Sequence, residues 1–245
     1  MPQIVYQIKA LRFERVSADA VFTLEVPDLT VKRGERIALL GPSGCGKSTL
    51  LDLLSLIALP DKAVQFDFSP TQEIQVPLAS SAKSGNIHNR LARLRKYHIG
   101  YILQTGGLLP FLNIEANIKI CQELTGKLDK DWLLKLATRL EIERHFKKKP
   151  GALSTGERQR VAVARALAHK PSVVIADEPT AALDPSNADK VLELLVSLTD
   201  QLDATLLLAT HDSVRLERFE FKRLSQRFGE DTTSKTVLSI FEDCR

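Results

Sequence analysis

The sequence predicts an α/β fold with a mainly parallel sheet, and three features of the chain favour it. Apolar runs of strand length alternate with segments whose apolar residues follow helical spacing. A glycine-rich loop at residues 41–49 lies between an apolar run and a leucine-rich segment, which is the order strand, loop and helix. Farther along, the buried-strand pattern of residues 172–178 ends in two acids, and parallel α/β sheets bind ligands at the carboxyl ends of their strands.

Length and composition are those of a globular chain. The chain has 245 residues, of which 44% are hydrophobic and 26% are charged, so it can bury a sizeable single core. We expect one domain over residues 1–245, with a helical subdomain at roughly 105–168. The net charge of +4 is too small to favour nucleic acid as a partner. Basic clusters at residues 90–96 and 147–149 are interpreted as solvated faces, with anionic lipid or a protein partner as the alternative.

Nothing in the sequence predicts a membrane span or an export signal. A span needs about 20 apolar residues, and Asp52 interrupts the longest candidate, residues 50–59. The first residues lack a charged start followed by an apolar core. Cys45 lies in the glycine-rich loop, and Cys121 and Cys244 have no metal-ligand spacing, which favours a reduced, cytoplasmic chain. We therefore expect membrane association only through a partner.

The first third of the chain alternates short apolar and polar runs. These predict several strands leading into the glycine-rich loop, at residues 4–8, 21–26 and 29–31. From Lys47 to about residue 59 the spacing predicts a buried helix that Pro60 ends. Residues 61–89 contain prolines and a polar stretch, and we interpret them as strand fragments and loop.

The rest of the chain alternates helical and strand patterns. Helical spacing over 113–169 places Trp132, Leu133, Leu136 and Leu140 on one face, which predicts an inserted helical layer. The other predicted elements are a basic helix at 89–97, a strand at 99–103 before Gln104, a strand at 172–178, a helix at 186–200, a strand at 205–209 before His211, and two strands within 219–241.

The glycine-rich loop has the composition of a phosphate-binding loop. Its glycines tolerate left-handed backbone angles, so consecutive N–H groups can converge on phosphates at the positive end of the following helix. In such a loop Lys47 reaches the β- and γ-phosphates and Ser48 ligates Mg²⁺. The alternative is a glycine turn that fits the pattern by chance. The predicted nucleotide contacts here are Gly41, Pro42, Ser43, Gly44, Cys45, Gly46, Lys47, Ser48 and Thr49.

A second, rarer pattern lies at residues 153–167, Leu-Ser-Thr-Gly-Glu-Arg-Gln-Arg followed by an alanine-rich helix. Ser154 and Gly156 precede that helix, so its N-terminus is suited to an anion. The segment resembles the signature motif of ATP-binding cassette (ABC) ATPases, in which it contacts the γ-phosphate of ATP bound to the opposite subunit. The resemblance implies that Ser154, Thr155, Gly156 and Glu157 contribute to nucleotide binding.

The resemblance to ABC ATPases extends, in family order, from about residue 30 to 212. Gln104 matches the Q-loop glutamine, Asp177 and Glu178 match the Walker B pair, residues 182–184 match the D-loop, and His211 matches the switch histidine. The resemblance implies a P-loop NTPase (RecA-like) core with a mainly parallel sheet, an N-terminal antiparallel β part and an inserted α-helical subdomain. Residues 99–104 and 108–110 are similar to the lipoprotein-releasing and macrolide-export branch.

Each matched side chain also suits its role chemically. Asp177 can hold Mg²⁺ through its hydration shell, and Gln104 at a strand end can reach both Mg²⁺ and a mobile loop. Glu178 can orient and deprotonate the attacking water. His211, directly after a strand, is interpreted as a γ-phosphate sensor. Each residue also has an alternative interpretation. Asp177 and Glu178 can be a solvated acid pair, Gln104 a surface glutamine and His211 a structural histidine.

Three departures from the family pattern stand out. Thr155 replaces the first of two glycines, and a β-branched residue there disfavours positive φ, although its hydroxyl can donate to phosphate. No Tyr or Trp occupies the adenine-stacking position near Ala18, where Phe13 and Phe22 are the available substitutes. Residues 61–89 lack the glycine-containing strand pair usual in the family. Glu157 in place of glutamine is a familiar alternative.

The resemblance implies an ATPase that drives transport. Two copies would pair head to tail and trap two ATP molecules, each between Lys47 of one copy and Ser154 of the other. A separate membrane permease would dock near residues 109–111, which places the chain on the cytoplasmic face of the membrane. The alternatives are a soluble ABC ATPase acting on nucleic acid or ribosomes, and a weakly hydrolysing, ATP-dependent assembly clamp.

Overall fold

The computed structural model describes residues 3–17, 20–79, 87–230 and 236–243. The chain divides into two compact units, the first formed by Met1–Ala92 with Leu207–Arg245 and the second by Arg93–Leu206. The boundaries fall within helix α2 (Ile87–His98) and strand β8 (Thr205–Thr210). The predicted extent of the helical subdomain, 105–168, stays a prediction.

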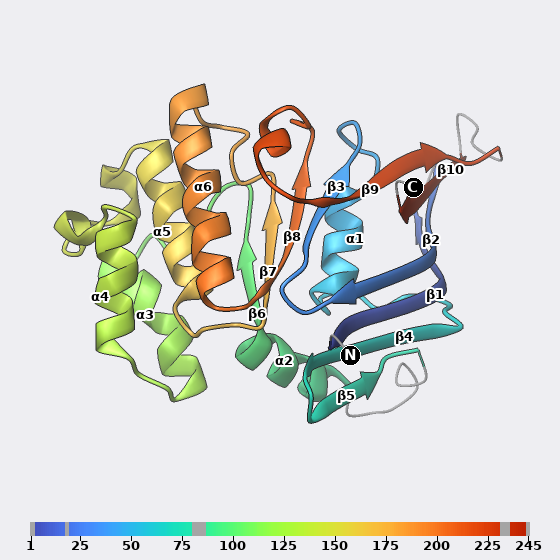
Figure 1. Ribbon diagram of the computed structural model, residues 1–245, viewed down its shortest axis with the longest axis horizontal. Coiled ribbons are helices and arrows are strands. Elements are labelled where there is room, and N and C mark those ends of the chain that lie inside the picture. Colours follow the sequence, from blue (N-terminus) through green and yellow to red (C-terminus); the bar gives the residue numbers. More distant parts are fainter. Residues whose placement is uncertain (1–2, 18–19, 80–86, 231–235, 244–245) are drawn as a thin grey trace. The chain divides into compact units, whose positions relative to one another are not determined.

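The first unit is built on a sheet whose strands come from both ends of the chain (Figure 1). Long antiparallel strands form one part of it, and parallel pairs join β10 to β2 and β9 to β3. The spatial order is β5-β4-β1-β2-β10-β9-β3-β8. The strands are β1 (Ile4–Val16), β2 (Val21–Lys32), β3 (Arg36–Leu40), β4 (Gln65–Thr71), β5 (Ile74–Pro77), β9 (Lys222–Phe228) and β10 (Thr236–Asp243). The unit also holds helix α1 (Lys47–Leu54) and the 3-10 turn η4 (Arg215–Arg218).

Burial alternates along β4, whereas the consecutive residues Ile37, Ala38 and Leu39 of β3 are all buried, so β3 is covered on both faces. Tyr6 is fully buried and stacks on Phe68 of β4, with ring centroids 4.9 Å apart. Its hydroxyl donates to the carbonyl of Leu54 at 2.7 Å, which ties β1 to the end of α1. Burial raises the pKa of Tyr6, so the phenol stays neutral.

One sequence-based expectation is corrected in this unit. The predicted helix 47–59 ends early, at Leu54, because Leu56 adopts a left-handed φ of 62°. The strand fragments expected within 61–89 are present as β4 and β5, which pair antiparallel. Neither strand contains glycine, and pairing with β1 and burial of apolar side chains stabilise the pair. Residues 80–86 lie outside the described residues.

The second unit consists of a parallel strand pair and a helical layer (Figure 1). Helix α5 packs against α3, α4 and α6. Two buried bonds hold the layer together, from Trp132 Nε1 to the Leu167 carbonyl at 3.0 Å and from Gln122 Nε2 to the Ala168 carbonyl at 2.9 Å. The elements are β6 (Ile99–Ile102), β7 (Val173–Asp177), α3 (Ile114–Thr125), α4 (Lys130–Arg139), α5 (Thr155–Leu167), α6 (Pro185–Gln201), η2 (Glu143–His145) and η3 (Pro150–Ala152).

Most predicted elements of the second half are confirmed within one to three residues. The four apolar residues assigned to one helical face, Trp132, Leu133, Leu136 and Leu140, are all buried. The pair of strands expected within 219–241 is present as β9 and β10, which are antiparallel. Within the described ranges, no helix combines the length and the apolar character needed to cross a membrane.

Candidate functional site

The glycine-rich loop joins β3 to α1 in the first unit, in the order that the sequence predicts. Gly44 and Gly46 adopt left-handed φ angles of 78° and 100°. A Cβ at Gly46 would lie 2.6 Å from Cζ of Phe22, closer than non-bonded atoms approach. Both the backbone angle and the space therefore require glycine at this position.

Lys47 is buried at the base of this loop, with 5% of its surface exposed. Its Nζ donates to the carbonyls of Gly41 at 2.8 Å and Pro42 at 3.0 Å, so the ammonium group is held inside the curve of the loop. Helix α1 starts after Gly46 without a side-chain cap, and its first turn carries no acid. The positive end of the helix is therefore open to an anion, as a triphosphate requires.

The remaining loop residues divide into exposed and buried ones. Pro42, Ser43, Gly44 and Ser48 are exposed, which leaves the Ser48 hydroxyl accessible to a metal ion. Cys45 is buried, and its carbonyl accepts a 2.6 Å bond from Ser239 Oγ of β10. Sequence reasoning missed this support from Ser239 and from Phe22, because both lie far from the loop in sequence.

The signature segment begins helix α5 in the second unit and is capped by its own side chains. Ser154 is the N-cap residue, and its Oγ accepts the Glu157 N–H at 3.3 Å. Glu157 Oε2 in turn accepts the N–H of Ser154 at 2.8 Å and its hydroxyl at 2.9 Å, which completes a capping box. These two bonds, and then the nearby charge of Arg144, hold the pKa of Glu157 below its usual value.

Thr155 fits this segment without backbone strain. It is the first residue of α5 and is absent from the positive-φ residues of the described chain, so the expected conflict at this position does not arise. Its Oγ1 accepts a 3.0 Å bond from Arg158 Nη2, which leaves the hydroxyl proton available to donate. A Cβ at Gly156 would contact only Asn187, at an ordinary 3.7 Å.

Gln104, Asp177 and Glu178 meet at one edge of the second unit. Strands β6 and β7 are parallel and Ile102 pairs with Ala176, so the residues that follow them emerge together. Glu178 has a φ of 47°, a conformation that costs a non-glycine residue about 1–3 kcal/mol and is typical of functional positions. His211 belongs to the first unit, where it is exposed directly after β8.

The loop after Gln104 is tied to the helical layer. The carbonyls of Gly107 and Gly106 accept bonds from Arg165 of α5 at 2.7 and 3.0 Å. Asn117 of α3 binds both backbone groups of Leu109, at 2.8 Å to the N–H and 3.0 Å to the carbonyl. No sequence motif predicts these contacts, which fix the loop to the same helix that carries the signature segment.

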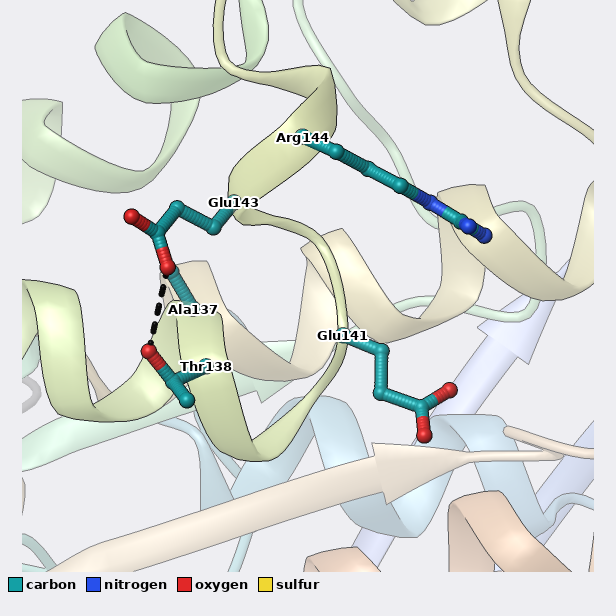
Figure 2. A pocket seen from close by; sticks show the side chains of 5 residues that line it. All are labelled: Ala137, Thr138, Glu141, Glu143 and Arg144. Atoms are coloured by element: carbon teal, nitrogen blue, oxygen red, sulfur yellow. Dashed lines mark hydrogen bonds between the residues drawn. The ribbon is translucent and has the colours of Figure 1, made fainter.

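A surface pocket of about 730 Å³ lies elsewhere in the second unit (Figure 2). It is lined by Ala137, Thr138, Glu141, Glu143 and Arg144. None of these residues was predicted to bind nucleotide, and none is in the signature segment. The volume of this pocket is therefore no evidence that it is the nucleotide site.

Residues 24–181 match the family described as ABC transporter, which is more than half of the chain. The chain belongs to the ABC transporter family. It is 36% identical over 208 residues to the lipoprotein-releasing system ATP-binding protein LolD of Legionella pneumophila, covering 82% of this chain and 87% of the relative. It is 30% identical over 224 residues to the ABC transporter ATP-binding protein MJ0796 of Methanocaldococcus jannaschii, covering 88% and 90%.

Two further similarities concern a fused transporter and a solved structure. The macrolide export ATP-binding/permease protein MacB 2 of Aeromonas hydrophila is 37% identical over 216 residues, covering 86% of this chain and 32% of the relative. The dimeric post-hydrolysis structure of MJ0796 bound to ADP and Pi superimposes with a TM-score of 0.76 at 27% identity, covering 95% of this chain and 96% of that one.

Family membership makes the chain an ATP-hydrolysing nucleotide-binding subunit that uses ATP and Mg²⁺. The sequence-based predictions of the family, the fold class, the enzyme activity, these cofactors and the partners, a second copy and a membrane permease, are confirmed. The predicted site residues fit both ATP and Mg²⁺. No cluster of three or more His, Cys, Asp or Glu occurs among the described residues. A Mg²⁺ ion held by one hydroxyl, one acid, water and phosphate needs none.

Proposed function

We propose that this chain drives a membrane permease of the lipoprotein-releasing or macrolide-export type by ATP-dependent, head-to-tail pairing of two copies. The similarity to LolD and MacB proteins supports the branch. In this role the chain lies on the cytoplasmic face of the membrane, attached through the permease. The cargo is selected by the permease rather than by this chain.

The observation that carries the proposal is the open N-terminus of α1 with Lys47 inside the loop. The loop N–H groups bind the phosphates, Lys47 contacts the β- and γ-phosphates, and Ser48 ligates Mg²⁺. Ser48 would help to hold the Mg²⁺ ion, which would supply positive charge next to the phosphates during hydrolysis. Of the predicted loop contacts from Gly41 to Thr49, Lys47 acts through its ammonium group and Ser48 through an exposed hydroxyl, and the others act through their backbone.

The family resemblance assigns the remaining roles residue by residue. Asp177 and Gln104 would hold the metal and its water, and Glu178 would orient and deprotonate the attacking water. His211 of the first unit senses the γ-phosphate. The residues from Ser154 to Glu157 complete the site of the opposite copy, with the Gly156 backbone and the Thr155 hydroxyl as donors.

The permease docks on the loop after Gln104. Phe111 in this loop is 69% exposed, and Leu103 at its start is 43% exposed. The loop is fixed to α3 and α5 by Asn117 and Arg165, so a force on it reaches the signature helix directly. This arrangement suits a surface that converts dimer closure into movement of a partner.

Replacement of Glu178 by glutamine tests the proposal. We expect the E178Q variant to lose ATPase activity by about 100-fold or more, because the general base is gone, while it forms an ATP-dependent dimer in size-exclusion chromatography. The exposed Glu193 of α6 provides a matched control, and E193Q should hydrolyse ATP normally. Normal turnover by E178Q would remove Glu178 from its role, and a variant that stays monomeric with ATP would contradict the pairing.

A further inference from the structure

His145 makes a contact with the signature segment that neither the motif nor the family assigns. It lies in the turn η2, nine residues before Ser154, and only 4% of its surface is exposed. Its Nε2 is 2.9 Å from Glu157 Oε1, the carboxylate oxygen that the capping box leaves unused. Glu157 is therefore held from two sides, by Ser154 through one oxygen and by His145 through the other.

The groups around the His145 imidazole indicate which of its two ring nitrogens carries the proton. Nδ1 of His145 is buried and has no hydrogen-bond partner among the described residues, so a proton there would be buried without an acceptor. Nε2 is also 3.1 Å from Nε of Arg144, a contact that requires a bare Nε2. Because one nitrogen cannot serve both neighbours, the charged carboxylate is favoured over Arg144, whose side chain is 70% exposed and can bind water instead.

The backbone around His145 is fixed to the helical layer. The His145 N–H donates to the Ile142 carbonyl at 2.9 Å, and the His145 carbonyl accepts from Lys148 at 2.8 Å. The Lys148 carbonyl accepts the N–H of Ile114, the first residue of α3, at 3.0 Å. The imidazole thus reaches Glu157 from a backbone that is hydrogen-bonded to the start of α3.

We propose that His145 is a positioning residue for ATP hydrolysis, whose Nε2–H fixes Glu157 and through it the orientation of the Ser154 backbone and hydroxyl. Without His145, Arg144 is the nearest cation, and at 3.7 Å its Nη2 lies beyond hydrogen-bond distance of Glu157 Oε1. Glu157 then has freedom to leave the capping box. The inference rests on the proposed function, because it acts only if the signature segment completes the site of a second copy.

The experiment compares three variants of the full chain. H145L removes the donor at similar volume, H145Q retains an N–H that can reach Glu157, and E143Q is a matched control in the same turn. Glu143 lines the pocket and accepts a 3.2 Å bond from Thr138 Oγ1 (Figure 2). Each variant is assayed for kcat, for affinity of a fluorescent ATP analogue, and for ATP-dependent dimerisation in the E178Q background.

We expect kcat and dimerisation of H145L to fall about tenfold, as loss of a hydrogen bond to a charged group implies, with nucleotide affinity of the monomer unchanged. H145Q should recover most of the loss, and E143Q should match the unaltered chain. Equal losses in H145L and H145Q would show a packing role and overturn the inference, as would normal kcat in H145L. If E178Q alone fails to dimerise, the proposed function fails instead.

A measurement on the unaltered chain covers the case in which H145L does not fold. ¹⁵N spectra of the imidazole distinguish the two tautomers, and we expect His145 as the Nε2–H form with a hydrogen-bonded proton. A neutral Nδ1–H form would overturn the assignment, because Nε2 would then accept from Arg144 and repel Glu157.

Discussion

Helices α1 and α5 both begin at predicted anion sites, but their N-termini are built differently. Helix α1 follows the glycine-rich loop, and helix α5 begins within the signature segment. Helix α1 starts at a left-handed glycine, with no side-chain cap and no acid in its first turn. Helix α5 starts at Ser154, and Glu157 closes a capping box over the same end. One helix end is open and carries a buried lysine, whereas the other is occupied by its own carboxylate.

This difference teaches how the two halves of a composite site divide their work. The open end of α1 can bind phosphate in a single chain, because its donors compete with no internal acceptor. The end of α5 is partly satisfied by its own capping box, so it gains less from an anion and serves to complete a site made by another copy.

Replacement of the buried Lys47 should abolish the function of the open N-terminus of α1 as a phosphate site. We expect K47A to lower ATP hydrolysis by about 10²–10³-fold, because one preorganised cation that faces the phosphates is lost. ATPase activity and the affinity for a fluorescent ATP analogue are the measurements. K190A on the exposed face of α6 is the control and should behave normally. A K47A chain that binds and hydrolyses ATP would show that the loop is an ordinary turn.

Alanine in place of Gly46, at the start of α1, and in place of Gly156, in the first turn of α5, should have opposite effects on stability. In G46A the φ of 100° and the 2.6 Å approach to Phe22 cost about 1–3 kcal/mol and distort the loop. G156A meets only Asn187 at 3.7 Å, and alanine in a helix stabilises it by about 0.5–1 kcal/mol. Urea unfolding of both variants is the measurement. Equal losses of stability would mean that the loop is not strained as described.

Loss of the serine cap should affect stability and turnover separately. We expect S154A to lose about 1 kcal/mol of unfolding free energy and also to slow ATP hydrolysis. Asn113 caps α3 in the same way, accepting the Ala116 N–H at 2.8 Å, so N113A is the matched control. It should lose similar stability and keep its activity. If N113A slows hydrolysis as much, the effect of Ser154 is only on folding.

The contribution of the capping carboxylate should depend on pH. Hydrogen bonds from Ser154 hold the pKa of Glu157 below its usual value of 4.5, so the ionised form stabilises the folded chain. That stability is fully present above the unfolded-state pKa and is lost as pH falls through the folded-state pKa. The difference in unfolding free energy between the unaltered chain and E157Q should therefore shrink below about pH 4. A difference that persists in acid would contradict this account.

Sequence reasoning located most helices and strands, because their signals are local. Helix α5 was visible from its serine and glutamate and from the alanine-rich run that follows. For β4 and β5 the sequence indicated only strand fragments, since their pairing depends on β1, almost sixty residues earlier in the chain. The early end of α1 was missed for a similar reason, because Leu56 is held in its left-handed conformation by a buried environment.

The sequence predicted which residues form the site, but not which other residues hold them in place. The sequence indicated Lys47, Glu178 and the signature residues because phosphate chemistry requires these side chains in this order. It also suggested that Thr155 would conflict with the backbone, and the helical φ of that residue shows otherwise. Ser239 and His145, which support the loop and the capping box, carry no motif.

The sequence by itself determined the family, the glycine-rich loop and the order of the motifs, because glycine, lysine and acid spacings encode local geometry and chemistry directly. Only the tertiary structure decided that α1 is open while α5 is capped from two sides. It also decided that Phe22 packs against the loop and that Glu157 meets His145. These outcomes depend on contacts between residues that are distant or unpatterned in sequence, and packing and buried hydrogen bonding select them only once the chain is folded.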